Sequence, residues 1–281
     1  MSRYKTALLA TGALLAAVAT QPASAADFAV KAPVVAPIVD PWSGLYASFA
    51  AGGTSTSAKS SELANFVFTS TNQPLPETSS FSDSLSGQDI GAVFTFAMGY
   101  NVVWGRWLVG IQSEVSYNKT LIDATGVGTS TQQSPNNNFS SIFTQDVRAD
   151  IERNWTVSEM ARIGYLVAPD WLVYGLVGWS WSGFDFRGDI NNRLLALPYT
   201  LSGITYGAGI EKNFGWLRAF IQYKGINFDS KSVNLPASST FTQTFNGATA
   251  ASVTSGADAR RLSADVQEIT AGVTIPINFL R

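Results

Sequence analysis

Residues 90–101 read IGAVFTFAMGYN. The even-numbered residues, from Ile90 to Tyr100, are apolar and mostly large, whereas the odd-numbered residues are small or polar. A period of two is typical of a β-strand whose two faces meet different surroundings. The stretch therefore predicts a strand with one apolar face and one face of small or polar side chains.

The same alternation recurs along the chain. It is clear in 107–118, 203–211, 217–224 and 269–279, and shorter in 45–52. In 151–166 two charged residues, Arg153 and Glu159, fall on the apolar face, and 171–186 is apolar on both faces, so its sides stay unassigned. With 90–101, these segments predict eight strands.

The connections between these strands alternate in length. Residues 103–106, 167–170 and 213–216 form short connections, whereas 54–87, 122–150, 187–200 and 229–261 are long and rich in Ser, Thr and Asn. Short turns at one end and long polar loops at the other are typical of outer-membrane barrels, and an even number of strands closes a sheet without free edges. The predicted fold is all-β: an eight-stranded antiparallel transmembrane β-barrel with short periplasmic turns and long extracellular loops.

A soluble β-sandwich or a lipocalin-like barrel is the alternative, because a period of two does not say which face is wet. Only 14% of the residues are charged, which is low for a soluble protein. Aromatic residues also gather beside the short turns, where a membrane barrel carries an interfacial girdle. The predicted girdle comprises Tyr100, Trp104, Trp107, Tyr165, Trp171 and Trp216.

The N-terminus predicts export. Arg3 and Lys5 precede the apolar stretch 7–19, and small residues up to Ala25 predict signal cleavage between Ala25 and Ala26. An uncleaved anchor is the alternative, but the apolar stretch is short for a spanning helix. The predicted organisation is a signal peptide at 1–25, a Pro-containing periplasmic tether at 26–41 and an outer-membrane barrel at 42–281.

The composition excludes several kinds of chemistry. The chain has no His and no Cys, so it lacks the residues for a Ser-His-Asp triad, a Cys nucleophile, a disulfide or a thiolate or imidazole metal site. Acidic and basic residues nearly balance, at 20 and 18, which speaks against a nucleic-acid partner. We expect no enzymatic activity, no cofactor and no metal.

Five charged residues fall on the small-residue faces of the strands: Glu114, Arg162, Glu211, Arg218 and Lys224. Charges inside a narrow barrel are costly unless paired, so we expect an interior network of ion pairs. The alternative is a polar pore gated by those pairs. Side chains just fill the interior of an eight-stranded barrel, which favours a plug over a channel.

Several short motifs carry a family resemblance. The stretch PWSGLY at 41–46 resembles the W-[ST]-G-[FL]-Y entry of the small alphaproteobacterial outer-membrane barrels called outer-membrane immunogenic proteins, which are related in shape to the OmpA membrane domain. Gly99-Tyr100, RIGY at 162–165, WLVY at 171–174 and GAGIE at 207–211 also resemble that family. The chain departs from the family pattern at its end, where Phe279 is followed by Leu280-Arg281.

The resemblance implies a surface-antigenic protein that supports envelope integrity. We therefore expect a structural outer-membrane barrel with a plugged interior, and the alternative is a small nonspecific porin for hydrophilic solutes. The expected partners are outer-membrane lipid, lipopolysaccharide and the outer-membrane insertion machinery.

Overall fold

The computed structural model describes residues 40–69, 77–134, 139–190, 193–234, 242–245, 248–255 and 259–277. Apart from Asp40 and Pro41, they belong to the compact unit Trp42–Arg281. The predicted signal peptide, the cleavage site at Ala25 and Ala26, and the predicted tether up to residue 39 lie outside the described residues. No helix in the described ranges is long and apolar enough to cross a membrane.

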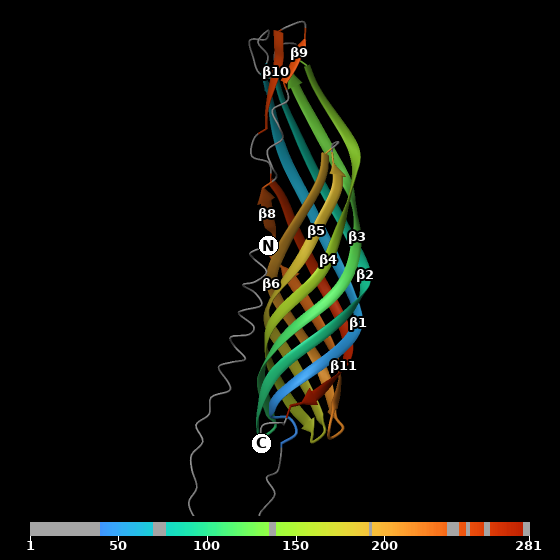
Figure 1. Cartoon of the computed structure of the whole chain (residues 1–281), viewed down its shortest axis with the longest axis vertical. Coiled ribbons are helices and arrows are strands. Elements are labelled where there is room, and N and C mark those ends of the chain that lie inside the picture. The colour runs from blue at the N-terminus through green and yellow to red at the C-terminus, as the bar shows by residue number, and fades with distance from the viewer. Residues whose placement is uncertain are drawn as a thin grey trace, which may run out of the picture. The chain divides into compact units, whose positions relative to one another are not determined.

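The described residues form one antiparallel sheet (Figure 1). The strands are β1 (Gly44–Thr69), β2 (Glu77–Trp104), β3 (Trp107–Ser134), β4 (Phe139–Ala168), β5 (Trp171–Ile190), β6 (Arg193–Asn213), β7 (Arg218–Phe228), β8 (Lys231–Asn234), β9 (Thr242–Phe245), β10 (Ala248–Ser255) and β11 (Ala259–Pro276). Each of the strands β1 to β6 pairs with the next, and β11 pairs with both β7 and β1, which closes a ring of eight strands. The prediction of an all-β, eight-stranded antiparallel barrel is confirmed.

Short turns gather at one end of the ring. Residues 105–106 join β2 to β3, residues 169–170 join β4 to β5, and residues 214–217 join β6 to β7. Gly105 and Gly215 have φ angles of 64° and 96°, in the left-handed region that glycine adopts at little cost. These three connections lie where the sequence predicted short turns.

The prediction of long loops at the opposite end is wrong for most of the residues concerned. Strands β1 and β2 continue through 54–69 and 77–87, and β3 and β4 through 122–134 and 139–150. Figure 1 shows β1 to β4 running well past the ends of β5 and β6. Thr and Ser in these stretches alternate between the two faces, and β-branched Thr suits a strand. These polar residues therefore belong to strands and not to loops.

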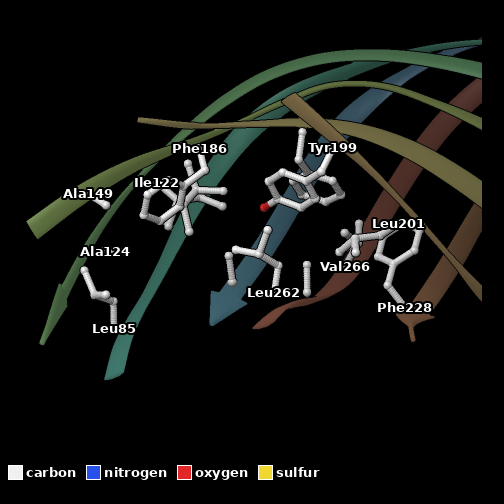
Figure 2. Close-up of a cluster of buried hydrophobic side chains, with 14 of the residues drawn as sticks. Leu85, Ile122, Ala124, Ala149, Phe186, Tyr199, Leu201, Phe228, Leu262 and Val266 are labelled. Carbon is white, nitrogen blue, oxygen red and sulfur yellow. The ribbon is translucent and has the colours of Figure 1, made fainter. Parts of the chain in front are cut away.

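The barrel divides into two halves with different interiors. We call the part next to the short turns the turn-side half (45–54, 90–104, 107–118, 155–168, 171–182, 203–213, 218–225 and 269–276) and the remainder the distal half. Inward side chains of the turn-side half are mostly polar or charged. Most of those of the distal half are apolar and form one cluster, of which Figure 2 shows a part. Its members are Ala58, Phe81, Leu85, Ile122, Ala124, Val147, Ala149, Ile151, Phe184, Phe186, Tyr199, Leu201, Ile226, Phe228, Leu262, Ala264 and Val266.

The polarity of the outer surface also changes between the two halves, from apolar residues in the turn-side half to polar and charged residues in the distal half. On β4 the outward residues are charged at Arg148 and Asp150 and, apart from Glu159, are apolar from Trp155 toward the turn. On β11 they are polar at Asp265 and Gln267 and apolar from Ile269 onward. Strands β3, β5, β6 and β7 change in the same way, so the polarity of the outer and inner surfaces inverts together.

A bulge on β4 lies at this boundary. The pairing of β4 with β5 shifts between Arg153 and Trp155, which leaves Asn154 as an extra residue. The side chain of Asn154 donates a hydrogen bond of 2.8 Å to Asp185. Because an extra residue reverses the alternation, Arg153 points inward although Trp155 points outward.

Candidate functional site: the charged interior

The turn-side interior contains all five charged residues that the sequence predicted there. Glu114 comes from β3, Arg162 from β4, Glu211 from β6, and Arg218 and Lys224 from β7, and each side chain is buried. Each of the five faces inward on its strand, and a residue adjacent to it in the sequence is apolar and faces outward. The structure joins them into two groups.

The first group is centred on Glu211. Arg162 donates a hydrogen bond to Glu211 Oε2, and Arg218 Nε lies 3.1 Å from Glu211 Oε1. Two tyrosine rings flank the Arg162 guanidinium, whose central carbon lies 5.5 Å from the Tyr46 ring and 3.8 Å from the Tyr174 ring. Stacking on aromatic faces suits the weakly hydrated, planar guanidinium. This group therefore holds two cations on one carboxylate and two rings.

The second group is a chain of four charges. Lys224 Nζ binds Glu114 Oε1 and lies 2.9 Å from Glu268 Oε2. Glu268 Oε1 accepts a hydrogen bond of 2.9 Å from Arg153. Because cations and carboxylates alternate and balance, the charges stabilise one another within the barrel.

Two members of this chain were missed by sequence reasoning. Arg153 was assigned to the apolar face, and the bulge at Asn154 turns it inward. Glu268 directly precedes the predicted strand 269–279, whereas β11 begins at Ala259. The alternation of 259–268 would have placed Glu268 inside had that strand been extended.

Neutral side chains link the charged groups. The Tyr46 hydroxyl donates to Gln112 Oε1 at 2.9 Å, and the Gln112 amide donates to Glu114 at 3.2 Å. The Tyr174 hydroxyl donates to Gln222 at 3.0 Å. The two tyrosines thus hydrogen-bond to amides while their rings contact Arg162.

Trp42 packs against the turn-side end of this interior. Its indole nitrogen donates a hydrogen bond of 3.1 Å to the Pro169 carbonyl oxygen, and its side chain is buried together with Leu108 and Leu172. The Arg218 guanidinium carbon lies 5.3 Å from the Trp42 ring. Sequence reasoning noted Trp42 as part of a family motif and gave it no role.

Little space is left inside the barrel. The void among Glu114, Arg162, Tyr174 and Glu211 has a volume of about 10 Å³, which holds at most one water molecule. Beyond it the buried side chains of the apolar cluster point into the distal half (Figure 2). Along the barrel axis, the charged network of the turn-side half is therefore followed by the apolar cluster of the distal half.

A third charged group lies at the distal edge of the apolar cluster. Arg260 binds Glu62, donates to Asp83 at 2.7 Å and donates to the Ser60 hydroxyl at 2.8 Å. The Arg260 guanidinium carbon lies 4.8 Å from the Phe186 ring. This group therefore contacts the apolar cluster through the Phe186 ring.

Tyr199 places a hydroxyl in the apolar cluster. Its ring stacks on Phe184 with centroids 5.4 Å apart. Burial raises the pKa of the Tyr199 hydroxyl above its usual value of 10.0, and the carboxylate of Asp185 acts in the same direction. The phenol is therefore held in its neutral form.

The six residues of the predicted girdle lie next to the short turns. Trp104 and Trp107 flank residues 105–106, and Trp216 lies within the turn between β6 and β7. Trp107 and Tyr165 contact each other edge to face, with centroids 5.1 Å apart. Tyr100 and Trp171 are also outward, and Lys212 Nζ lies 4.8 Å from the Trp171 ring. The six side chains therefore share the outer surface near one end of the barrel.

The acidic residues of the described part of the chain were also compared with the requirements of a metal site. Its Asp and Glu residues form no group of three or more that could hold a metal ion. The carboxylates of the interior are instead bound by Arg and Lys, as given above.

Comparison with known proteins gives matches only at the level of structure. No protein-family model matches the chain, and no curated protein sequence matches it. The chain is similar to the outer-membrane protease OmpT from Escherichia coli, with 8% identity over 83% of this chain and 96% of that one and a TM-score of 0.43. It is also similar to the outer-membrane protein OprG from Pseudomonas aeruginosa, with 10% identity, coverages of 83% and 97% and a TM-score of 0.40. For Ail, the attachment invasion locus protein of Yersinia pestis, the values are 10%, 80%, 99% and 0.31.

Proposed function

We propose that this chain is a bacterial outer-membrane barrel whose turn-side half spans the membrane and whose distal half projects into water. The inversion of polarity at one level supports this placement. In the turn-side half most outward residues are apolar and most inward residues polar, and in the distal half most inward residues are apolar and the outer surface carries charged and polar residues. The apolar outward runs 107–117, 155–165 and 171–181 are close to the about 9–11 residues with which a tilted strand crosses a bilayer.

The distal half then resembles a small soluble barrel joined to a membrane barrel. Its outward charges face water, and its apolar cluster supplies the core that a water-exposed sheet requires. The aromatic residues beside the turns would lie at the periplasmic interface. This orientation follows from the short turns, which outer-membrane barrels place in the periplasm.

We further propose a structural role in the envelope and display of the distal half at the cell surface. The single observation that carries it is the filled interior. Ion pairs occupy the turn-side half, the apolar cluster occupies the distal half, and the void between the charged groups is about 10 Å³. The small nonspecific porin is the alternative, and such a packed interior does not favour it. Catalysis is not part of the proposal. The resemblance to the outer-membrane immunogenic proteins agrees with a structural and antigenic role.

Cysteine labelling tests the placement, because the natural chain has no Cys. Lys59→Cys and Asp265→Cys lie on the outer surface of the distal half, and Ala51→Cys and Ala271→Cys lie on the same strands in the turn-side half. In intact cells a membrane-impermeant maleimide should label the first two variants and spare the last two. Equal labelling of all four would contradict the placement.

Gene deletion tests the role. A structural barrel predicts increased detergent sensitivity with unchanged uptake of small hydrophilic solutes. Loss of uptake with an intact permeability barrier would instead support the porin.

A further inference from the structure

Strand β4 has an unpaired edge in the distal half. It pairs with β5 only from Arg148 toward the turn, so residues 140–146 have β3 on one side and, among the described residues, no strand on the other. We call residues 140–146 the bare edge. Figure 1 shows this part of β4 beyond the ends of β5 and β6. Ile142 and Phe143 are 68% and 59% exposed there, and an exposed edge with apolar side chains is a template for pairing with another strand.

The long edge of β6 in the same half is protected against such pairing. Asp229 N donates a hydrogen bond to Ser202 O on the β7 side, so Thr200 and Pro198, at alternate positions, face the same side beyond the end of β7. Pro198 has no N–H to offer, and Thr200 O accepts a hydrogen bond of 3.1 Å from Lys231.

The remaining edges of the described sheet are covered or short. Strand β10 covers the distal edge of β1, and β8 and β9, at the two ends of the sheet order, are 4 residues long each. Very short edge strands, Pro and Lys are the features with which proteins protect their edges. The bare edge is longer and contains neither Pro nor Lys, so it differs from every other edge of this sheet.

The main chain of the bare edge is oriented for pairing. Leu166, on the inner face of β4, donates its N–H to Arg106 O on the β3 side. Inward residues of β4 therefore bind β3, and outward residues direct their N–H and C=O groups to the opposite side. By alternation with the buried Val147, the outward residues of the bare edge are Ser140, Ile142, Thr144 and Asp146. Each of them directs one donor and one acceptor toward the open side.

We propose that the bare edge pairs with the bare edge of a second copy of this chain that projects from an apposed membrane. This inference rests on the surface display of the distal half proposed above. Copies in one membrane have β4 strands that run in the same direction, and a two-fold axis along them would set N–H opposite N–H and C=O opposite C=O. Antiparallel edges, related by an axis perpendicular to the sheet, match donors with acceptors. That arrangement requires the two copies to point in opposite directions.

The side chains of the bare edge are complementary in this arrangement. The longest overlap of residues 140–146 with themselves is centred on Phe143, so the two Phe143 rings lie opposite each other. Ile142 then lies opposite Thr144 of the second copy, and Ser140 lies opposite Asp146, whose carboxylate can accept a hydrogen bond from the hydroxyl. No charged residue meets a like charge. Aromatic and β-branched cross-strand pairs stabilise a sheet, and the overlap supplies about eight main-chain hydrogen bonds.

Disulfide formation tests the pairing, because the natural chain has no Cys. The two Phe143 residues occupy a non-hydrogen-bonded pair, in which Cα atoms lie about 4.5 Å apart and within reach of a disulfide. Two cell populations that express Phe143→Cys with different epitope tags are mixed and oxidised. We expect a disulfide-linked dimer that carries both tags. Leu63→Cys on β1 is the matched control, because Leu63 is also 59% exposed but lies away from the bare edge, and it should give no such dimer.

A second measurement isolates the main chain. Thr144→Pro removes an N–H that points to the open side and leaves the β3 side of the strand unchanged, whereas Thr144→Val keeps it. Cells that display Thr144→Pro should need a roughly tenfold higher surface density to aggregate, since one hydrogen bond is lost on each copy. Thr144→Val should aggregate like the natural protein. Heat-modifiable gel mobility confirms that both variants are folded, and equal aggregation of the two would contradict main-chain pairing.

Labelling of Lys59→Cys separates this proposal from the proposed function. If the membrane-impermeant maleimide does not label Lys59→Cys in intact cells, the distal half is not displayed and the proposed function fails. If it does label that variant, and Phe143→Cys gives no dimer or only dimers with a single tag, the display stands and the pairing between membranes is wrong.

Discussion

Arg153 of β4 and Glu268 of β11 form an ion pair of 2.9 Å across the barrel, with side chains that are 0% and 1% exposed. The pair lies at the level where the apolar cluster meets the charged interior. Ile151 and Val266, the preceding inward residues on the two strands, both belong to the apolar cluster. Both strands thus change from apolar to charged at the same level and bind each other there.

The two partners should differ in how much they stabilise the barrel. Glu268→Gln leaves Arg153 and Lys224 without their shared carboxylate, and removing one partner of a buried pair costs about 3–5 kcal/mol. Arg153→Met should cost less, because Lys224 still neutralises Glu268. Urea unfolding in lipid vesicles, followed by tryptophan fluorescence, measures both. Lys119→Ala, which removes an exposed contact to Glu152 at 3.9 Å, is the control and should cost no more than about 1 kcal/mol. A larger loss for Lys119→Ala than for Glu268→Gln would contradict this.

Opening the charged interior alone should not make the barrel conduct. Glu114→Ala and Arg218→Ala remove ion pairs from the turn-side half but leave the apolar cluster beyond it intact. We expect no stable single-channel steps in planar bilayers from the natural protein or from either variant. Steps in the natural protein that change in Glu114→Ala would support the porin.

The distal half should depend on its apolar cluster for its own stability. Phe186 is fully buried and contacts Arg260, and Phe→Ala in a core costs about 3–5 kcal/mol. Phe186→Ala should make the distal half sensitive to protease added to intact cells while the turn-side half stays protected. Phe214→Ala, at an exposed turn position, is the control. Equal resistance of the two variants would show that the cluster does not hold the distal half together.

Tyr199 should make the barrel sensitive to alkali. Its hydroxyl pKa is raised above the 10.0 of the unfolded chain, so the native state keeps a proton that the unfolded state loses. The contribution is fully present below about pH 10 and declines as the pH rises above that value. The unfolding free energy of the natural protein should therefore fall more steeply above pH 10 than that of Tyr199→Phe.

The sequence predicted the turn-side half well because the alternation there separates two unlike surfaces. In 107–118 the outward residues are mostly large and the inward ones, apart from Leu108, are polar or small, so both the strand and the inward position of Glu114 follow from the pattern. The strand 171–186 has apolar residues on both faces. The structure places Leu172 and Leu176 inside and Val173 and Val177 outside.

The distal half was not predicted because its pattern is reversed and its polar residues resemble those of loops. Ser55, Ser57 and Lys59 face outward there and Ala58 faces inward. Because the sequence analysis expected lipid-facing outward residues to be apolar, it ended the predicted strand before these polar residues. Arg153 was misplaced for a different reason. A one-residue bulge shifts the alternation by one position, and in the sequence this shift shows only as a charged residue on the apolar face.

The closing contact between β1 and β11 also has a consequence for the order of folding. Its register runs from Tyr46 opposite Pro276 to Leu63 opposite Ala259, so it joins segments from the two ends of the sequence. Pairs of strands that are adjacent in the sequence can form before the rest of the chain is in place. The pairing of β1 with β11 can form only after the last strand, β11, is present. Contacts of such long sequence separation slow folding, since the whole intervening chain must first be arranged. Until β11 arrives, β1 and β7 expose unpaired edges that can pair with other chains. A truncation that removes β11 should therefore yield aggregated chains rather than a seven-stranded barrel.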